Sequence, residues 1–380
     1  MLYRELGRTG KKASVIGLGC ENAETAGDGQ VKELINAALD GGVNILDIFM
    51  PGREVRERIM RALGSRRKEV MIQGHLGSTA VNRQYDISRD LPSVRRYFED
   101  MLRIFGGYID IGMLFYLDSD KDFQGVFETG FIDYARQLQE KGDIGHIGFS
   151  SHNPETAMRV VNTGAVETML FSINLAFDMH PAEADVLTSL EEGFKPGTLL
   201  GIDPKRAELY RLCEQKGVGI TVMKTFGAGK LLSWEHTPFQ TPMTPAQCIH
   251  YALCRPAVAS VLLGCKNSAE VQNALTYLDI SDEERDYAPV LQGACKSMHG
   301  SCVYCNHCLP CPSEIDIAAV NKYLDIARLD EERIPPSVRS HYQSLAHRAE
   351  ECTACGSCEG RCPFGVPVIR NMEDARRLLG

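Results

Sequence analysis

The residues best suited to chemistry in this sequence are eight of its fourteen cysteines, which gather near the end of the chain. They form two blocks that share the spacing Cys-x2-Cys-x2-Cys, and each block ends with a further Cys that precedes a proline. The blocks contain Cys302, Cys305, Cys308 and Cys311, followed by Cys352, Cys355, Cys358 and Cys362. Thiolate sulfur is a soft ligand for iron and zinc, so this grouping predicts a metal site rather than disulfides.

The spacing favours iron–sulfur clusters over zinc. Three thiolates at three-residue steps surround one corner of a 4Fe–4S cluster, and in such runs the cysteine before the proline ligates the other cluster. The expected ligand sets are Cys302, Cys305, Cys308 and Cys362 for one cluster, and Cys352, Cys355, Cys358 and Cys311 for the second. Structural zinc usually needs only two Cys-x2-Cys hooks. Whether such clusters transfer electrons or only support the fold stays open.

The elements that precede these blocks alternate between short apolar segments and helix-like stretches with a 3.6-residue period. The expected strands are 13–18, 44–48, 70–73, 109–115, 144–149, 168–172, 219–223 and 259–263. The expected helices are 30–39, 54–63, 91–104, 127–141, 153–163, 204–215, 244–254 and 268–276. Eight such repeats predict an α/β fold, a (β/α)8 TIM barrel. A doubly wound sheet is the alternative, but the first turn lacks its full glycine fingerprint.

The pattern changes near residues 281–289, which lead into the cysteine region. We therefore predict a barrel over residues 1–285 and a small, mainly helical ferredoxin-like domain over residues 286–380, which would hold two 4Fe–4S clusters. A long loop over residues 179–200, rich in Glu, Pro and Gly, interrupts the repeats after the sixth strand. In a barrel it would lie at the C-terminal face, where substrates bind.

Composition narrows the class of protein. Apolar residues make up 44% of the 380 residues and charged residues 24%, as in globular proteins. No apolar run approaches the roughly 18 residues of a membrane helix, and the start, MLYRELGRTGKKAS, lacks the apolar core of a secretory signal. The net charge of −9 disfavours a nucleic-acid partner. We expect a cytoplasmic protein without a membrane partner.

Several segments resemble the aldo/keto reductase family, in particular its branch with a C-terminal ferredoxin-like domain. The matching segments are YRELGRTG at 3–10, GFSSH at 148–152, FSIN at 171–174, VMKTFGAGK at 222–230 and SVLLGCKN at 260–267. In order and spacing they cover essentially the whole chain. The resemblance implies an oxidoreductase that binds NADP(H) at the C-terminal face of the barrel.

The resemblance also implies which residues hold that cofactor. They are Ser150, Asn174, Lys224, Gly227, Gly229, Gly264 and Lys266. Ser150 and Asn174 match positions that hydrogen-bond the nicotinamide carboxamide, and Lys266 matches a cation that meets the 2′-phosphate. Glu270 stands where the family often has Gln, and a carboxylate there repels a phosphate.

The catalytic tetrad of the family, Asp, Tyr, Lys and His, is not carried over intact. Asp47 keeps the Asp, but Pro51 falls at the Tyr position, His75 at the Lys position and Phe115 at the His position. Asp47 and His75 would end adjacent strands on the catalytic face. We therefore expect a pair in which Asp47 stabilises the protonated imidazole, so that His75 can act as a general acid.

These features predict an oxidoreductase that acts on an unknown small molecule by a mechanism departing from the family tetrad. A cluster accepts single electrons and not a hydride, so a flavin could join the clusters to NADP(H). A ferredoxin-type carrier could exchange electrons with the clusters. Two alternatives stay open at this stage. One is a non-redox lyase or isomerase that uses Asp47 and His75 with the clusters as scaffold, and the other is a non-catalytic electron-transfer protein.

Overall fold

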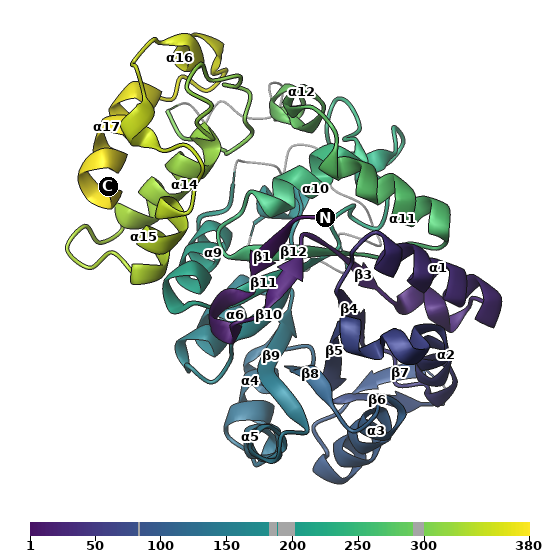
Figure 1. The fold of residues 1–380 in the computed structure, drawn as a ribbon. Helices are drawn as coiled ribbons and strands as arrows, with labels where there is room; N and C mark the ends of the chain where they lie inside the picture. The colour runs from purple at the N-terminus through teal and green to yellow at the C-terminus, as the bar shows by residue number, and fades with distance from the viewer. Residues whose placement is uncertain (83, 182–187, 189–201, 292–299) are drawn as a thin grey trace. The chain divides into compact units, whose positions relative to one another are not determined.

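A computed structural model describes residues 1–82, 84–181, 188, 202–291 and 300–380 (Figure 1). Most of the long loop expected at 179–200 lies outside these residues. The chain forms two compact units. The first comprises Met1–Ser172, Val218–Thr225 and Val258–Leu278, and the second comprises Ile173–Gly217, Phe226–Ala257 and Asp279–Gly380. The segments before and after the seventh barrel strand, which lies within Val218–Thr225, therefore belong to the same unit as the cysteine blocks. The predicted boundary at residue 285 stays a prediction.

The first unit is built around a closed barrel of eight parallel strands, which confirms the predicted fold (Figure 1). In order around the barrel they are β3 (Ile16–Gly19), β4 (Ile45–Ile48), β5 (Met71–Leu76), β8 (Ile109–Leu114), β9 (Ile144–Ser151), β10 (Thr168–Ser172), β11 (Gly219–Met223) and β12 (Val258–Leu263). Nearly every residue of these strands is buried, as expected for continuous apolar segments in a parallel sheet.

The helices of the first unit follow the strands in the predicted alternation. They are α1 (Asp28–Asp40), α2 (Arg53–Leu63), α3 (Leu91–Ile104), α4 (Asp120–Phe127), α5 (Phe131–Lys141), α6 (Pro154–Asn162) and α11 (Ser268–Leu275). Side-chain caps define several of their starts, since Asp90, Asn153 and Asn267 each accept a backbone N–H of the first turn. The single helix expected at 127–141 is in fact the end of α4 followed by α5.

Two antiparallel hairpins lie outside the barrel sheet. Strands β1 (Tyr3–Glu5) and β2 (Lys12–Ser14) form the first, so the strand expected at 13–18 is divided between β2 and β3. A Cβ atom on Gly219, at the start of β11, would lie 2.5 Å from the Gly7 nitrogen, so this hairpin packs against the N-terminal end of the barrel. The second hairpin, β6 (Ser78–Val81) and β7 (Gln84–Ile87), is inserted after β5.

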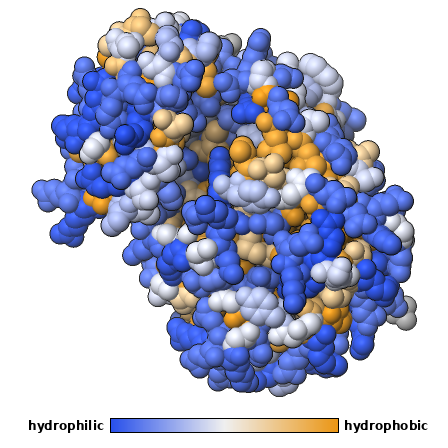
Figure 2. Space-filling model, in the orientation of Figure 1, coloured by the Kyte–Doolittle hydropathy of each residue, from blue (hydrophilic) through white to orange (hydrophobic). Residues whose placement is uncertain are grey.

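The second unit is mainly helical. Its elements are α7 (Leu175–Asp178), α9 (Pro204–Lys216), α10 (Pro245–Leu253), α12 (Asp282–Arg285), α13 (Ala288–Leu291), α14 (Ile317–Ala327), α15 (Pro336–Gln343), α16 (Ser357–Arg361) and α17 (Val368–Leu379). Helices α14 and α17 pack together along buried apolar residues that include Leu324 and Met372. The face of this C-terminal region seen in Figure 2 is mainly hydrophilic. No helix among the described residues has the length and apolar character needed to span a bilayer.

Candidate functional site

A buried carboxylate–imidazole pair lies at the C-terminal ends of β4 and β5. Asp47 on β4 is paired in register with Gln73 on β5, and His75 lies two residues further, on the same side of the strand. His75 Nε2 lies 2.8 Å from Asp47 Oδ1, and Gln73 Nε2 donates to the same oxygen at 3.0 Å. Asp47 is 6% exposed and His75 is 2% exposed. The contact expected between Asp47 and His75 is therefore present.

The pair is held by a chain of hydrogen bonds that crosses the barrel. Thr221, on β11, donates from its hydroxyl to Gln73 Oε1 at 3.0 Å, so Gln73 must present its amide nitrogen to Asp47. Sequence reasoning missed both Gln73 and Thr221. The position of Gln73, two residues before His75 in a strand, places both side chains on one face and could have identified it.

His75 has one ring nitrogen engaged and one without a hydrogen-bond partner. Within the part of the chain that the structure describes, Nδ1 of His75 is buried and contacts no donor or acceptor. With Nε2–H donating to the carboxylate, a neutral imidazole carries its lone pair on Nδ1. Buried polar atoms nearly always have a hydrogen-bond partner in folded proteins. A hydrogen-bond donor on a ligand would supply the missing partner of this atom.

Aromatic rings surround the imidazole. The Phe115 ring meets His75 edge-on at 5.1 Å between centroids, and Phe49 lies 6.3 Å away. Tyr85 packs against both rings, at 5.8 Å from Phe49 and 6.4 Å from Phe115. Tyr85 comes from the β6–β7 hairpin, and no spacing in the sequence could have placed it here. Apart from Asp47, the neighbours of the His75 imidazole are therefore aromatic rings.

Ser150 and its neighbours at the end of β9 are tied to the loop after β8. The hydroxyl oxygen of Ser150 accepts the Tyr116 backbone N–H at 2.9 Å, and the hydroxyl of Ser151 donates to Asp118. His152 Nδ1 lies 2.8 Å from the other Asp118 oxygen. Burial of Asp118 acts to raise its pKa, but the hydrogen bonds from His152 and Ser151 outweigh it and lower the pKa. The Tyr116 N–H thus positions the Ser150 hydroxyl oxygen at the end of β9.

In addition to Ser150, three residues expected to bind NADP(H) lie in the first unit. Lys224, at the end of β11, has a positive φ of 61°. Gly264 follows β12, and its carbonyl accepts from Asn22 at 3.0 Å. The backbone N–H of Lys266 donates to Glu270 Oε2 at 2.8 Å. The carboxylate of Glu270 is therefore directed at the backbone of the residue whose side chain is expected to meet the 2′-phosphate.

The other three expected residues lie in the second unit, in and beside the loop 226–230. The side-chain oxygen Oδ1 of Asn174 caps α7 by accepting the Phe177 N–H at 2.9 Å. Its amide nitrogen faces Gly227, where an added Cβ atom would lie 3.7 Å away. Gly227, Ala228 and Gly229 all have positive φ, which is strained for alanine. Within this turn the Gly229 N–H donates to the Phe226 carbonyl at 2.9 Å, and the Lys230 N–H donates to the Gly227 carbonyl at 3.1 Å.

The two cysteine blocks are a structural repeat. The residues on either side of the second cysteine, Tyr304 and Asn306 in the first block and Ala354 and Gly356 in the second, all have positive φ. Glu314 and Gly365, each three residues after the last cysteine of its block, also have positive φ. Each donates its backbone N–H to the carbonyl oxygen of that last cysteine, Cys311 or Cys362. This left-handed path, adopted even by non-glycine residues, turns the backbone around the thiols in both blocks.

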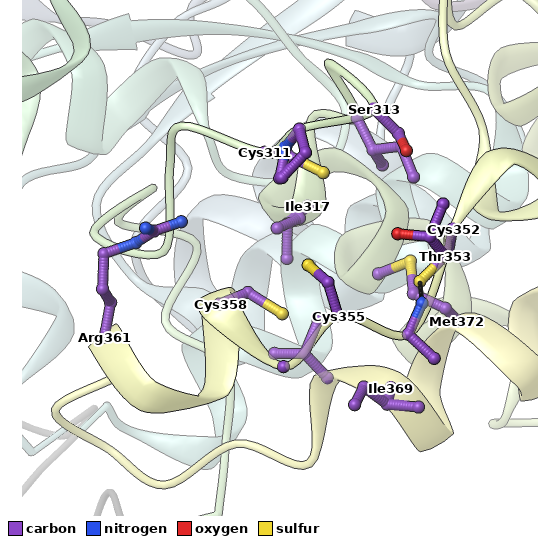
Figure 3. A pocket seen from close by; sticks show the side chains of 15 residues that line it. Cys311, Ser313, Ile317, Cys352, Thr353, Cys355, Cys358, Arg361, Ile369 and Met372 are labelled. Atoms are coloured by element: carbon purple, nitrogen blue, oxygen red, sulfur yellow. Dashed lines mark hydrogen bonds between the residues drawn. The ribbon is translucent and has the colours of Figure 1, made fainter.

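The thiols of the second block share a pocket with a cysteine of the first. Figure 3 shows Cys311, Cys352, Cys355 and Cys358 around one space, which apolar side chains such as Ile317 and Met372 also line. The backbone N–H of Ala354 donates to Cys352 Sγ at 3.4 Å. Hydrogen bonds from the backbone and the hydroxyl of Ser357 lower the pKa of Cys355. Four sulfurs in an apolar cradle with N–H groups directed at them fit a 4Fe–4S cluster.

The remaining four thiols, those of Cys302, Cys305, Cys308 and Cys362, are the other expected ligand set, and several of them lie close enough to act on one another electrostatically. Burial raises the pKa of Cys302, and the neighbouring thiols of Cys305 and Cys308 raise it further. Burial also raises the pKa of Cys305 to about 12, with a contribution from Cys362. No three His, Cys, Asp or Glu side chains among the described residues converge on a single ion. Zinc would draw its thiolates to about 3.8 Å from one another, from a Zn–S distance of about 2.3 Å. The described thiols do not form a group of that compactness.

Comparison with known proteins agrees with both parts of the chain. Residues 15–247 match the model of the aldo/keto reductase family, and residues 301–367 match that of a 4Fe-4S dicluster domain. A search of curated proteins found no match.

Solved structures of aldo-keto reductases share the fold. The holo form of AKR11C1 from Bacillus halodurans is 18% identical, covers 75% of this chain and 94% of its own, and has a TM-score of 0.58. A Pseudomonas aeruginosa protein assigned to the aldo-keto reductases is 20% identical over 72% of this chain and 93% of its own, with a TM-score of 0.55. With the family match over more than half of its residues, this chain belongs to the aldo/keto reductase family and carries a C-terminal 4Fe-4S dicluster domain.

Proposed function

We propose that this protein is an NADP(H)-linked oxidoreductase in which the Asp47–His75 pair replaces the proton donor of the family. The observation that carries the proposal is the buried Nδ1 atom of His75, which has no partner among the described residues while Nε2 contacts Asp47. The aromatic rings of Phe49, Phe115 and Tyr85 around it favour an apolar or aromatic carbonyl compound, or the matching alcohol, as substrate.

In this proposal His75 moves the proton. Asp47 stabilises the imidazolium, and Nδ1 delivers its proton to the carbonyl oxygen of the substrate while the carbonyl carbon is reduced. In the reverse direction, neutral His75 accepts the proton of an alcohol at Nδ1. Gln73 and Thr221 fix the orientation of Asp47 throughout. The nicotinamide supplies or accepts the hydride when bound.

The residues proposed to hold NADP(H) are Ser150, Asn174, Lys224, Gly227, Gly229, Gly264 and Lys266. The family match over residues 15–247 supports this assignment. The proposed clusters have Cys302, Cys305, Cys308 and Cys362 as one ligand set, and Cys311, Cys352, Cys355 and Cys358 as the other. They exchange single electrons with a ferredoxin-type carrier, and a flavin would be needed to join them to hydride chemistry.

The test uses the holoprotein purified without oxygen. NADPH oxidation is followed with a panel of aromatic aldehydes and ketones for wild type, His75→Gln and His146→Gln. His146 is a matched control because its Nδ1 also contacts a carboxylate, Glu167, but it lies near the start of β9, away from the catalytic end. We expect His75→Gln to reduce kcat by about 10²- to 10⁴-fold, with NADPH binding unchanged, and His146→Gln to retain activity.

Two results would contradict the proposal. Equal kcat for wild type and His75→Gln would remove His75 from the reaction. A wild-type protein that fails to bind NADPH, yet converts a substrate without net oxidation or reduction, would favour a lyase or isomerase built on the same pair. Adding NADPH to the holoprotein while recording the broad cluster absorbance near ~400 nm then tells whether clusters and nicotinamide are joined, since bleaching requires electron transfer between them.

A further inference from the structure

A buried arginine lies against the first cysteine block. Arg255 follows α10, on the segment that leads to β12, and is 4% exposed. Its Nη2 donates to the carbonyl oxygen of Val303 at 2.7 Å and to the Tyr287 hydroxyl at 3.0 Å, and its Nε donates to the Tyr251 carbonyl at 3.2 Å. Val303 lies between Cys302 and Cys305, so the guanidinium contacts the backbone of the expected ligand loop.

This guanidinium has no carboxylate partner in the described part of the chain. Its hydrogen bonds go to two carbonyls and a hydroxyl, and its remaining contacts are the ring faces of Tyr251 and Tyr304, 4.4 and 5.0 Å from the centroids. The buried carboxylate of Asp178 accepts from the side chains of Arg206, Tyr210 and Tyr251, and its charge also acts on Arg255. A buried guanidinium with no carboxylate in hydrogen-bond contact is destabilising. A negative group beside it would offset that cost.

The expected cluster would be that negative group. Arg255 and Cys302 line the same cavity, together with Val303 and Tyr304. A 4Fe–4S cluster with four thiolate ligands carries about two negative charges when oxidised and about three when reduced. A fixed cation beside it favours the more negative, reduced state, because the attraction grows with the added electron in a medium of low dielectric constant.

We propose that Arg255 is the counter-ion of the cluster held by Cys302, Cys305, Cys308 and Cys362, and that it raises the reduction potential of that cluster. The inference rests on the proposed ligand sets and does not depend on NADP(H) or on turnover. Arg255 is a positioning residue, since it acts on the cluster from outside the ligand set. Through it, the connection between α10 and β12 takes part in setting the redox properties of the dicluster domain.

The experiment is a redox titration of the anaerobic holoprotein, followed by electron paramagnetic resonance, with iron counted for each variant. In Arg255→Met we expect the equilibrium constant for reducing one cluster to fall at least about tenfold, which for one electron is about 59 mV. The other cluster should be unchanged. Arg255→Lys, which keeps the charge, should lie near wild type.

Arg376 provides a matched control. Its side chain also donates to backbone carbonyls, those of Ala349 and of Cys352 in the second cysteine block. Unlike Arg255, Arg376 is exposed to solvent. Arg376→Met should therefore shift neither potential measurably, because water screens its charge. Unchanged potentials in Arg255→Met with full iron content would overturn the proposal.

A variant that loses its cluster is also informative. If Arg255→Met binds half the iron of wild type while Arg255→Lys binds the full amount, the charge is needed to hold the cluster, and the proposal stands. If Arg255→Lys loses the same iron, the shape of the arginine matters and its charge does not, and the proposal fails. Wild-type protein with a single cluster would instead show that the ligand sets are wrong.

Discussion

Asp178 is the centre of a buried polar network in the second unit, and its removal should weaken the fold sharply. The side chain is fully buried at the end of α7. Its Oδ1 accepts from Arg206 Nε at 2.9 Å and from the Tyr210 hydroxyl at 2.5 Å, and its Oδ2 accepts from the Tyr251 hydroxyl at 2.7 Å. One carboxylate thus joins α7, α9 and α10.

The substitution Asp178→Asn keeps the volume but removes the charge and one acceptor oxygen. Removing one partner of a buried ion pair costs about 3–5 kcal/mol, and the oxygen that Asn retains places the expected loss at the lower end, about 3 kcal/mol. For a unit of this size that corresponds to a fall in Tm of roughly 6–12 °C. The measurement is thermal unfolding of the holoprotein under anaerobic conditions, followed by circular dichroism.

The control is Asp133→Asn, which breaks an exposed pair with Arg136 at 3.3 Å on α5. Exposed pairs of this kind contribute little, so its Tm should equal that of wild type. A Tm for Asp178→Asn within a degree or two of this control would refute the reasoning, because it would mean that the network tolerates loss of this carboxylate acceptor without cost.

Two further predictions concern other carboxylates. Burial acts to raise the pKa of Glu214 on α9. Its hydrogen bonds with His341 on α15, at 2.6 Å, and with the Ala257 N–H outweigh burial and hold the pKa below its ordinary value of 4.5. A carboxyl group of this kind stabilises the fold above its ordinary pKa, and the contribution is lost as the pH falls through the lowered value. Glu214→Gln should therefore flatten the acid side of a stability–pH curve from urea unfolding, and an identical acid slope in both proteins would contradict this. Glu270→Gln keeps an oxygen for the Lys266 N–H and removes the negative charge, so we expect NADPH to bind severalfold more tightly and NADH to be unaffected in a fluorescence titration. Equal gains for both nucleotides would show that the carboxylate does not face the 2′-phosphate.

The barrel was predictable because most of its strands are short apolar segments and most of its helices have a clear amphipathic period. The order of the strands then followed from the regular alternation of strands and helices. The second hairpin was not predictable, since β6 and β7 are short and carry exposed side chains such as Val81 and Tyr85. Their place in the fold depends on contacts with Phe49 and Phe115, which lie far away in the sequence.

The candidate site was predictable only where strand ends determine it. Asp47 and His75 end neighbouring parallel strands, so their contact follows from the fold. The partners that orient them, Gln73 and Thr221, belong to strands on different sides of the barrel, and pairing across its interior leaves no pattern in the sequence. The position of Arg255 was also hidden, because a single arginine after a helix normally lies in solvent.

The closing seam of the barrel has a consequence for how the chain is made. Strands β3 and β12 pair in parallel, with Ile16 beside Val261, so the first barrel strand has no neighbour on one side until the last has left the ribosome. Such distant pairing is slow to form, and an unpaired strand edge can pair with other chains in the meantime. Both cysteine blocks follow β12 in the chain. Synthesis therefore completes the last barrel strand before it delivers any of the thiols expected to receive iron.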